Sequence, residues 1–305
     1  MPLLDEPSRG EDGQALVFMA LFLTILLAAS AAVLDVGAWY RAQRNLQATV
    51  DAAALAGAQA LPEDPVEARA LAAEYLSKNG GVGAATTVSL ESQLQGGDTI
   101  KVEGVRTAPG ILSRVLGIDA VQVHAKGAAR SGVPDEARWA APVAVDERHP
   151  MLQCKPLPCF GQPTSIDLKK TGPGAFRLIN LDGSRGGTSP GTLAEWIVQG
   201  YDGYMPLGWY YSDPGAKFNS SQVDDAFDER LDDELLFPVY RGTRGQGANF
   251  EYEVVGFAGF HVTGYDFQGS NGVIDGDFTR LIWEGVQSLT GDAADFGVRS
   301  VSLVE

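Results

Sequence analysis

The fold is decided by residues 14–61, QALVFMALFLTILLAASAAVLDVGAWYRAQRNLQATVDAAALAGAQAL. The 22 residues between Asp12 and Asp35 carry no charge. As an α-helix they would be roughly 33 Å long, which is about the thickness of the hydrocarbon core of a bilayer. The residues that follow are mostly Ala, Leu, Gln and Arg, which favour helix, whereas Pro62 cannot continue one. The stretch therefore predicts one helix that crosses a membrane and continues into water as far as Leu61.

Three other interpretations of this stretch compete with a membrane span. A cleaved secretory signal would fit the small residues Ala29-Ser30-Ala31, but the uncharged run is longer than a usual signal, and one Arg and four acidic residues precede it. A core helix of a soluble protein would be shorter and would show a polar face. A pilin-type leader cleaved after Gly13 would want Glu at the position that Phe18 occupies. We favour the membrane anchor and leave cleavage open.

Composition limits the classes of partner. The chain has 305 residues, 45% of them hydrophobic and 20% charged, which is a globular balance with room for an anchor and two modest domains. The net charge is −16, and residues 131–305 contribute most of it, with 13 basic and 25 acidic side chains. Such a surface repels phosphate backbones, so no nucleic-acid partner is expected. Three His and two Cys are too few to predict a structural zinc site, and no metal or cofactor is expected.

A family pattern runs through this stretch. An apolar span opens with Gly-Gln and closes with Val-Asp-x-Gly, and an Arg-containing turn, Leu-Gln and Asp-x-Ala-Ala-Leu-Ala follow. The matching positions are Gly13, Gln14, Asp35, Gly37, Leu46, Gln47, Asp51, Ala53, Ala54, Leu55 and Ala56. The pattern resembles the N-terminal module of the TadG-like proteins of the tight-adherence (Flp) pilus system. The resemblance implies a single-pass anchor in the cytoplasmic membrane, with the bulk of the chain outside the cytoplasm and other pilus proteins as partners.

The predicted organisation is α+β. Residues 1–13 are polar and are predicted to be disordered, and residues 14–61 form the transmembrane and extended helix. Residues 62–130 are expected to hold a small domain of a helix (66–79), two strands (86–90 and 99–105), a second helix (109–116) and a third strand (120–128). This order resembles the small αββαβ domain of pilin-like proteins.

A linker and a β-rich domain are predicted to follow. Residues 131–150 contain three prolines and mixed charge, which indicates a linker or an irregular edge segment. Residues 151–305 are rich in Gly, aromatic and β-branched residues and predict a β-rich C-terminal domain. The expected elements are strands at 176–181, from 238, at 252–265 and at 273–283, helices at 193–198 and 222–236, and a hairpin loop at 269–272.

Cys154 and Cys159 bracket the sequence Lys-Pro-Leu-Pro. This spacing suits a tight loop closed by a disulfide, which persists only outside the reducing cytoplasm; two unrelated thiols are the alternative. The distribution of Arg argues weakly the other way, because Arg41 and Arg44 follow the span and only Arg9 precedes it. We give more weight to the cysteine pair and the family resemblance, and predict an extracytoplasmic domain.

Several acidic and glycine-rich patterns suggest chemistry, but each has a simpler structural explanation. Asp224, Asp228 and Asp232 share a helical face, yet helical carboxylates are too widely spread for calcium, so a solvated face is favoured. Asp275 and Asp277 are expected at a bent strand edge. The loop 183–187 lacks the Gly-Lys-Ser/Thr ending of a phosphate cradle, and the lone His261 lies in an apolar strand. The sequence therefore predicts no catalytic residue and no enzyme.

Aromatic residues support a rival hypothesis from another class. A membrane-tethered extracytoplasmic hydrolase or carbohydrate-binding protein would use them as a platform for sugar rings. The platform would consist of Trp209, Tyr210 and Tyr211 with Tyr201 and Tyr204. A deep cleft with converging carboxylates would favour this rival.

The extended helix also predicts a face for partner helices, composed of Asp35, Gly37, Ala53 and Gly57. Alanines recur at every fourth position beyond the span, and such small faces allow two helices to approach closely. The simpler explanation is that Ala is the best helix former. Asp35 is expected either to pair with a cation on a partner helix or to reach water at the membrane surface.

Overall fold

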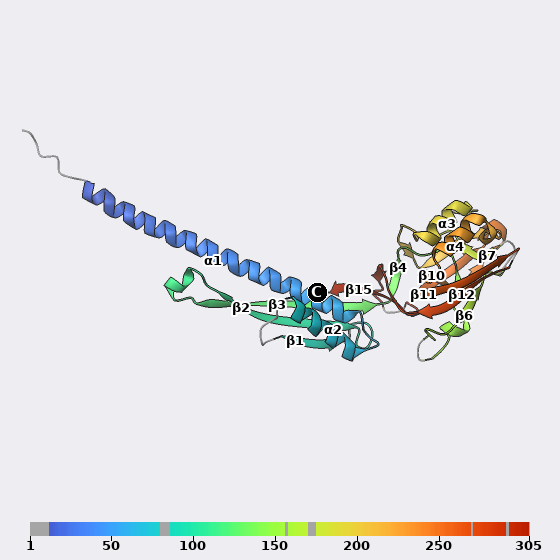
Figure 1. The fold of residues 1–305 in the computed structure, drawn as a ribbon, viewed down its shortest axis with the longest axis horizontal. Coiled ribbons are helices and arrows are strands. Elements are labelled where there is room, and N and C mark those ends of the chain that lie inside the picture. The colour runs from blue at the N-terminus through green and yellow to red at the C-terminus, as the bar shows by residue number, and fades with distance from the viewer. Residues whose placement is uncertain are drawn as a thin grey trace, which may run out of the picture.

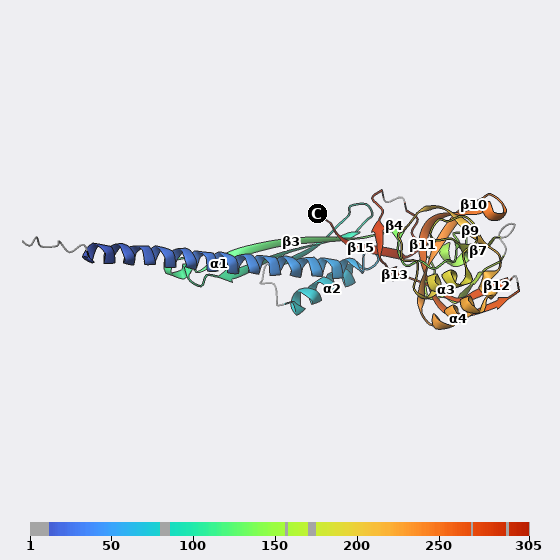
Figure 2. The ribbon, with the colours of Figure 1, turned by 90° about the horizontal axis from the view of Figure 1, so that it is seen from above.

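The computed structural model shows an elongated molecule: α1 projects from one end and a compact β-rich part forms the other (Figures 1 and 2). The structure describes residues 12–79, 86–155, 158–169, 175–269, 271–290 and 293–304. The predicted disordered segment 1–13 lies almost wholly outside these residues. The described residues form two separate hydrophobic cores, one built from residues between 46 and 129 and one from residues between 137 and 298.

Two helices begin the chain. The first, α1 (Asp12–Ala58), has 47 residues and confirms one continuous helix through the apolar stretch and beyond it. The second, α2 (Pro65–Lys78), starts where the Asp64 carboxylate accepts hydrogen bonds from the N–H groups of Val66 and Glu67, with proline in the first turn. From Leu46 onward one side of α1 is buried, and α2 folds back against it.

The first sheet lies beside the second half of α1, and we call it the anchor sheet. Its strand order is β1-β2-β3-β15-β13. Together with α1 and α2 it forms the anchor unit. The strand bounds are β1 (Thr87–Glu91), β2 (Thr99–Pro109), β3 (Ala120–Gly132), β13 (Leu281–Ile282) and β15 (Val298–Val304). The last strand of the chain, β15, thus returns to pair antiparallel with β3, so the segment 151–305 is not one separate unit.

The β2–β3 hairpin reaches along α1 toward its apolar N-terminal half (Figure 1). Thr99 pairs with Arg130 at its base, and Pro109 pairs with Ala120 near its tip. The helix predicted at 109–116 is wrong: β2 runs through Pro109, and the tip holds only a 3₁₀ turn, η1 (Ser113–Leu116). Cross-strand pairing extends too far along the chain to leave room for an α-helix.

The predicted linker at 131–150 is also wrong. It contains β4 (Pro134–Ala137) and β5 (Val145–Asp146), and Ala140, Ala141 and Val143 are buried in the second core. β4 lies between β14 (Gly285–Gln287) and β8 (Met205–Pro206) in a small three-stranded sheet, order β14-β4-β8. The small apolar side chains next to the prolines pack into the second core. The segment is therefore part of the folded structure and not a linker.

The remaining elements form the head, which we define as β4 to β12 together with β14. Its main sheet has the order β5-β10-β11-β12-β6, and β9 pairs with both β11 and β7. The strand bounds are β6 (Thr164–Asp167), β7 (Ala175–Ile179), β9 (Gly208–Pro214), β10 (Glu234–Arg244), β11 (Glu251–Gln268) and β12 (Asn271–Thr279). The helices are α3 (Pro190–Val198) and α4 (Ser221–Glu229), which lie side by side in Figure 1, and the 3₁₀ turns η2 (Pro150–Leu152), η3 (Lys217–Asn219) and η4 (Gly247–Asn249).

Two predicted elements of the head end earlier than expected. The helix predicted at 222–236 stops at Glu229, because Leu235, Leu236 and Phe237 are buried in β10. The strand predicted at 273–283 ends at Thr279, and the chain then leaves the head sheet for β13, which pairs with β15. The hairpin loop between β11 and β12 is shorter than the predicted 269–272, since β12 already begins at Asn271. The structure therefore has a long apolar N-terminal helix and a β-rich C-terminal region of mixed sheets.

Candidate functional site

The first half of α1 exposes its apolar side chains on all sides. Leu16, Phe18 and Phe22 are each more than 60% exposed, and none of the most apolar 18-residue window is buried. A core helix of a soluble protein would cover at least one stripe of these side chains. The helix is long and apolar enough to cross a bilayer, and this is consistent with a single-pass membrane anchor.

Asp35 ends the uncharged run and is only 1% exposed. Its carboxylate accepts hydrogen bonds from the backbone N–H groups of Ile111 at 3.1 Å, Leu112 at 3.0 Å and Ser113 at 2.5 Å. The expectation that Asp35 pairs with a partner helix or reaches water is therefore wrong. The β2–β3 hairpin places the free N–H groups of its turn against the helix, and the carboxylate satisfies them.

Trp39 and a further residue of the family pattern, Gln47, also hold this hairpin. The Trp39 indole donates to the carbonyl of Pro109 at 3.2 Å. The Gln47 amide donates to the carbonyl of Lys126 at 2.6 Å and to the Asp51 carboxylate at 2.8 Å. The pattern therefore encodes an intramolecular clamp between α1 and its own sheet, a role that sequence spacing alone could not indicate because the partners lie about 80 residues away.

The residues predicted to form one face of α1 for partner helices differ in burial. Ala53 is fully buried, and a Cβ added to Gly57 would come within 2.6 Å of Ile100 Cδ1 and 2.7 Å of the Ala68 carbonyl oxygen. Both residues pack against α2 and the anchor sheet of the same chain, so the expectation of a partner helix at these two positions is corrected. Gly37 is exposed, and a Cβ added there would meet nothing within 4 Å.

A buried polar junction connects the anchor unit with the small sheet. Arg299 is 5% exposed and donates to Glu63 at 2.9 Å and to Asp295 at 2.6 Å. The Gln287 amide accepts from Arg130 and donates to the carbonyls of Arg130 and Ser300. No local sequence pattern indicates these contacts, because Glu63, Arg130 and Arg299 come from distant segments that the pairing of β15 brings together.

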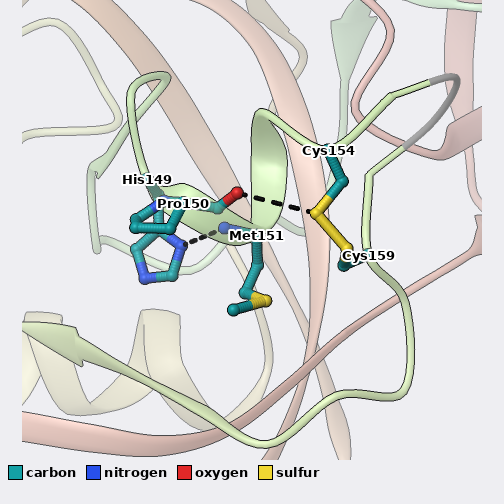
Figure 3. Close-up of a disulfide and its surroundings, with 5 residues drawn as sticks. All are labelled: His149, Pro150, Met151, Cys154 and Cys159. Atoms are coloured by element: carbon teal, nitrogen blue, oxygen red, sulfur yellow. Dashed lines mark hydrogen bonds between the residues drawn. A yellow bond between two sulfur atoms is a disulfide. The ribbon is translucent and has the colours of Figure 1, made fainter.

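Cys154 and Cys159 are joined in the structure, with their Cα atoms 5.6 Å apart (Figure 3). The loop follows η2, and the Cys159 N–H donates to the Met151 carbonyl at 2.8 Å. His149 caps the start of η2 by accepting from the Met151 N–H at 3.3 Å. Part of the predicted proline-stiffened loop, residues 156–157, lies outside the described residues. The cysteine pair thus closes a short loop on the surface of the head.

The five aromatic residues of the rival hypothesis do not share one face. Tyr210 is buried on the opposite side of β9 from Trp209 and donates to the Pro206 carbonyl, and burial raises the pKa of its phenol. Arg244 stacks 4.1 Å above the Trp209 ring. Tyr201 packs edge-on against Trp196, and the Tyr204 hydroxyl donates to Glu284. Tyr201 and Tyr210 are thus packed against the protein, whereas Trp209 and Tyr204 stay 37% and 48% exposed with separate partners, Arg244 and Glu284.

The acidic candidates are also dispersed. Asp228 accepts from the Tyr265 hydroxyl at 2.6 Å, whereas Asp232 lies beyond the end of α4. Asp275 accepts from Ser165, and Asp277 contacts His261 at 3.3 Å, so the two carboxylates have separate partners. Among the described residues, no group of three or more His, Cys, Asp or Glu side chains could hold a metal ion.

The glycine-rich loop at 183–187 closes around Asn180 instead of forming an open cradle. The buried Asn180 amide donates to the carbonyls of Ser184 and Gly186. Next to the loop, the Asp213 carboxylate accepts from the Thr188 N–H at 2.8 Å and pairs with Lys217. The backbone of the loop is thus occupied by the protein itself, which makes its role structural.

The fold combines a long exposed apolar helix, which is consistent with a membrane anchor, with a β-rich head. Comparison with known families adds that residues 13–60 match the family described as "Putative Flp pilus-assembly TadE/G-like". The match confirms the resemblance to TadG-like proteins, and with the apolar helix it supports a pilus-related membrane protein. No curated protein and no solved structure matches the chain. The family match ends before the head and carries no information about it.

Proposed function

We propose that this protein is a non-enzymatic component of a Tad/Flp-type pilus, anchored in the cytoplasmic membrane with its head outside the cytoplasm. It acts as a minor pilin-like subunit or as an assembly platform. The observation that carries the proposal is α1, whose first half is exposed and apolar while its second half is the core helix of the anchor unit. One rigid helix therefore connects the membrane with the folded part of the chain.

Other pilus proteins would meet this chain along the exposed half of α1. Val33, Val36 and Gly37 lie on the open surface of the helix, and the absence of a side chain at Gly37 lets another backbone approach closely. The buried positions Ala53 and Gly57 do not contribute. The contact face is thus restricted to the membrane-spanning part of the helix and its outer edge.

Photo-crosslinking tests this contact in producing cells that contain the pilus system. A photoreactive residue at Val33 is expected to cross-link to another pilin-like or pilus-assembly chain, because this side chain is 71% exposed on α1. The same residue at Leu289, which is 79% exposed outside α1, is the matched control and should give no such product. If Val33 yields no protein cross-link, and Val36 yields none either, the assembly role is contradicted.

The cysteine pair tests the topology. In intact spheroplasts a membrane-impermeant thiol reagent should label Cys154 and Cys159 only after reduction, because an extracytoplasmic head would hold them as a disulfide. External protease should also digest the chain beyond residue 45. Labelling without reductant would contradict the disulfide, and protection of the head from both reagents would place it in the cytoplasm and end the proposal.

A further inference from the structure

We propose that the tip of the β2–β3 hairpin, residues 110–119, is a second membrane contact of this protein. The tip inserts into the leaflet on the side of the folded domains, and lipid acyl chains occupy the groove between it and α1. This inference rests on the proposed membrane anchoring by α1. It goes beyond it, because a single-pass anchor requires only one segment of the chain to touch lipid.

The tip exposes apolar side chains although it belongs to a folded domain. The side chains of Ile111, Leu112, Val115 and Ile118 are all exposed, and Val115 is 87% exposed. Leu112, Val115 and Ile118 line an apolar groove of about 480 Å³ together with α1. Its lining on α1 consists of Leu27, Ala28, Ala31, Ala32, Asp35, Val36 and Trp39. In water this surface would be unfavourable, and it is continuous with the apolar surface of the span.

The position of the groove along α1 sets the depth of the tip. Leu27 precedes Leu34, the last residue of the uncharged run, by seven residues, which is about 10 Å along a helix. If the uncharged run spans the hydrocarbon core, the groove beside the tip extends that far below its edge. This depth matches the roughly 5–10 Å over which interfacial segments bury their apolar side chains.

Most backbone N–H groups of the tip already have hydrogen-bond acceptors within the protein, so the tip does not need water to satisfy them. Lipid-exposed irregular backbone is costly because unpaired N–H groups lose their hydrogen bonds. Here the N–H groups of Ile111, Leu112 and Ser113 donate to Asp35. Further N–H groups donate to carbonyls within the tip, namely those of Gly110, Val115, Gly117 and Ile118. The burial of Asp35 is thereby explained, since its carboxylate satisfies the turn where water cannot.

Charged residues limit how deep the tip can lie. Two charged residues of the tip, Arg114 and Asp119, are exposed. The long Arg114 side chain can reach the headgroup phosphates while its stem stays in the apolar zone. The tip therefore belongs at the boundary between headgroups and acyl chains, and not at the bilayer centre.

Depth-dependent fluorescence quenching tests this proposal on the full chain reconstituted in phospholipid vesicles. Val115→Cys, labelled with an environment-sensitive fluorophore, should show blue-shifted emission and lose fluorescence when spin-labelled lipid is added. Phe22→Cys, within the span, is the control for anchoring. Leu94→Cys, an exposed apolar residue in the turn at the other end of the same sheet, should show neither effect. The unsubstituted chain, whose two cysteines are paired, should take up no label.

The outcomes separate the inference from the proposed anchor. If Phe22 is quenched and Val115 is not, the anchor stands and the second membrane contact is refuted. If Phe22 is not quenched, the anchor itself fails, and the inference fails with it. Ile111→Cys provides a second reporter, because its side chain is also exposed. In cells that contain the pilus system, a photoreactive residue at Val115 that cross-links to another pilus protein would show that protein, and not lipid, fills the groove, and would refute the inference.

Discussion

In the anchor unit, α1 packs against α2 and the anchor sheet through alanines, whereas the head packs its sheet through aromatic rings. The small residues are Ala53, Ala54, Ala58, Ala68 and Ala72, all fully buried. The large ones are Phe218, Phe227, Phe237, Phe257, Phe260, Phe278 and Tyr252, each at most 2% exposed. Both regions contain antiparallel strands, so the contrast lies in the side chains and not in the backbone.

This contrast shows two ways to stabilise a unit of similar architecture. Small side chains let backbones approach closely, and stability then depends on the absence of extra volume. Large rings fill the space between layers, and stability then depends on their presence. The anchor unit should therefore be sensitive to added atoms, and the head should be sensitive to removed ones.

The largest effect is expected from truncating a ring in the head. Phe260 is fully buried, with Phe278 at 5.1 Å and Phe237 at 5.8 Å between ring centroids. Phe260→Ala should destabilise the head by about 3–5 kcal/mol, because it leaves a cavity among rigid rings. Hydrogen exchange of the solubilised full chain should show faster exchange in β10, β11 and β12.

The same measurement checks that the two cores are independent. Amides of α2 and β2 should keep their protection in Phe260→Ala, since none of their residues belongs to the head core. Loss of protection in both units would show that the junction around Arg299 couples them into one cooperative unit. The view that the two cores are stabilised independently would then be contradicted.

A smaller effect is expected from added volume in the anchor unit. Gly57→Leu should cost about 1–3 kcal/mol by overpacking, because even a Cβ at this position would meet Ile100 and the Ala68 backbone. Exchange should become faster in α2 and β2 while the head stays protected. Gly37→Leu is the matched control on the same helix, where the site is open, and should leave exchange unchanged. Equal effects of the two substitutions would contradict the packing difference along α1.

The smallest expected effect concerns a polar contact of the anchor unit. Asp98 is 1% exposed, and its carboxylate accepts from the N–H groups of Gln93, Leu94 and Gln95 at 2.8–2.9 Å. Burial acts to raise the pKa of Asp98, but these donors outweigh it, and the pKa lies below the usual Asp value. Because the folded-state pKa is depressed, its contribution to stability is present above the unfolded pKa and is lost as the pH falls through the folded pKa.

Asp98→Asn should therefore lower the free energy of unfolding of the anchor unit by about 1 kcal/mol near neutral pH. The difference from the unsubstituted chain should shrink as the pH falls below about 4. Denaturant titrations of the solubilised protein at a series of pH values would measure it. A difference that grows in acid would contradict the assigned direction of the pKa shift.

Much of the secondary structure could be predicted because its signals are local. The uncharged run before Asp35 predicted the exposed half of α1, and good helix formers predicted its continuation. Alternating residues located β2, β3 and β11, and the motif from Gly13 onward identified the family that comparison confirmed. The spacing of the two cysteines led to the pair that the structure joins.

The failures share one cause, which is that the deciding partners are far away in the sequence. The segment 109–116 has the local pattern of a helix, but pairing of β2 with β3 extends the strand to Pro109. The prolines at 131–150 suggest a linker, but neighbouring alanines fill the core of the head. The acidic helix ends at Glu229 because the residues that follow pair in β10 and bury their side chains in the core of the head.

By itself, therefore, the sequence determined that an apolar helix begins this chain, that the helix continues beyond the span, and that strands dominate the rest. These properties follow from hydropathy, helix propensity and the alternation of apolar and polar residues, all of which are set by residues close together in the sequence. Only the tertiary structure decided what the helix faces. It placed Asp35 under the hairpin tip, Gly57 against Ile100 and β15 beside β3. Burial and hydrogen bonding depend on which distant segments meet, and no local pattern encodes that.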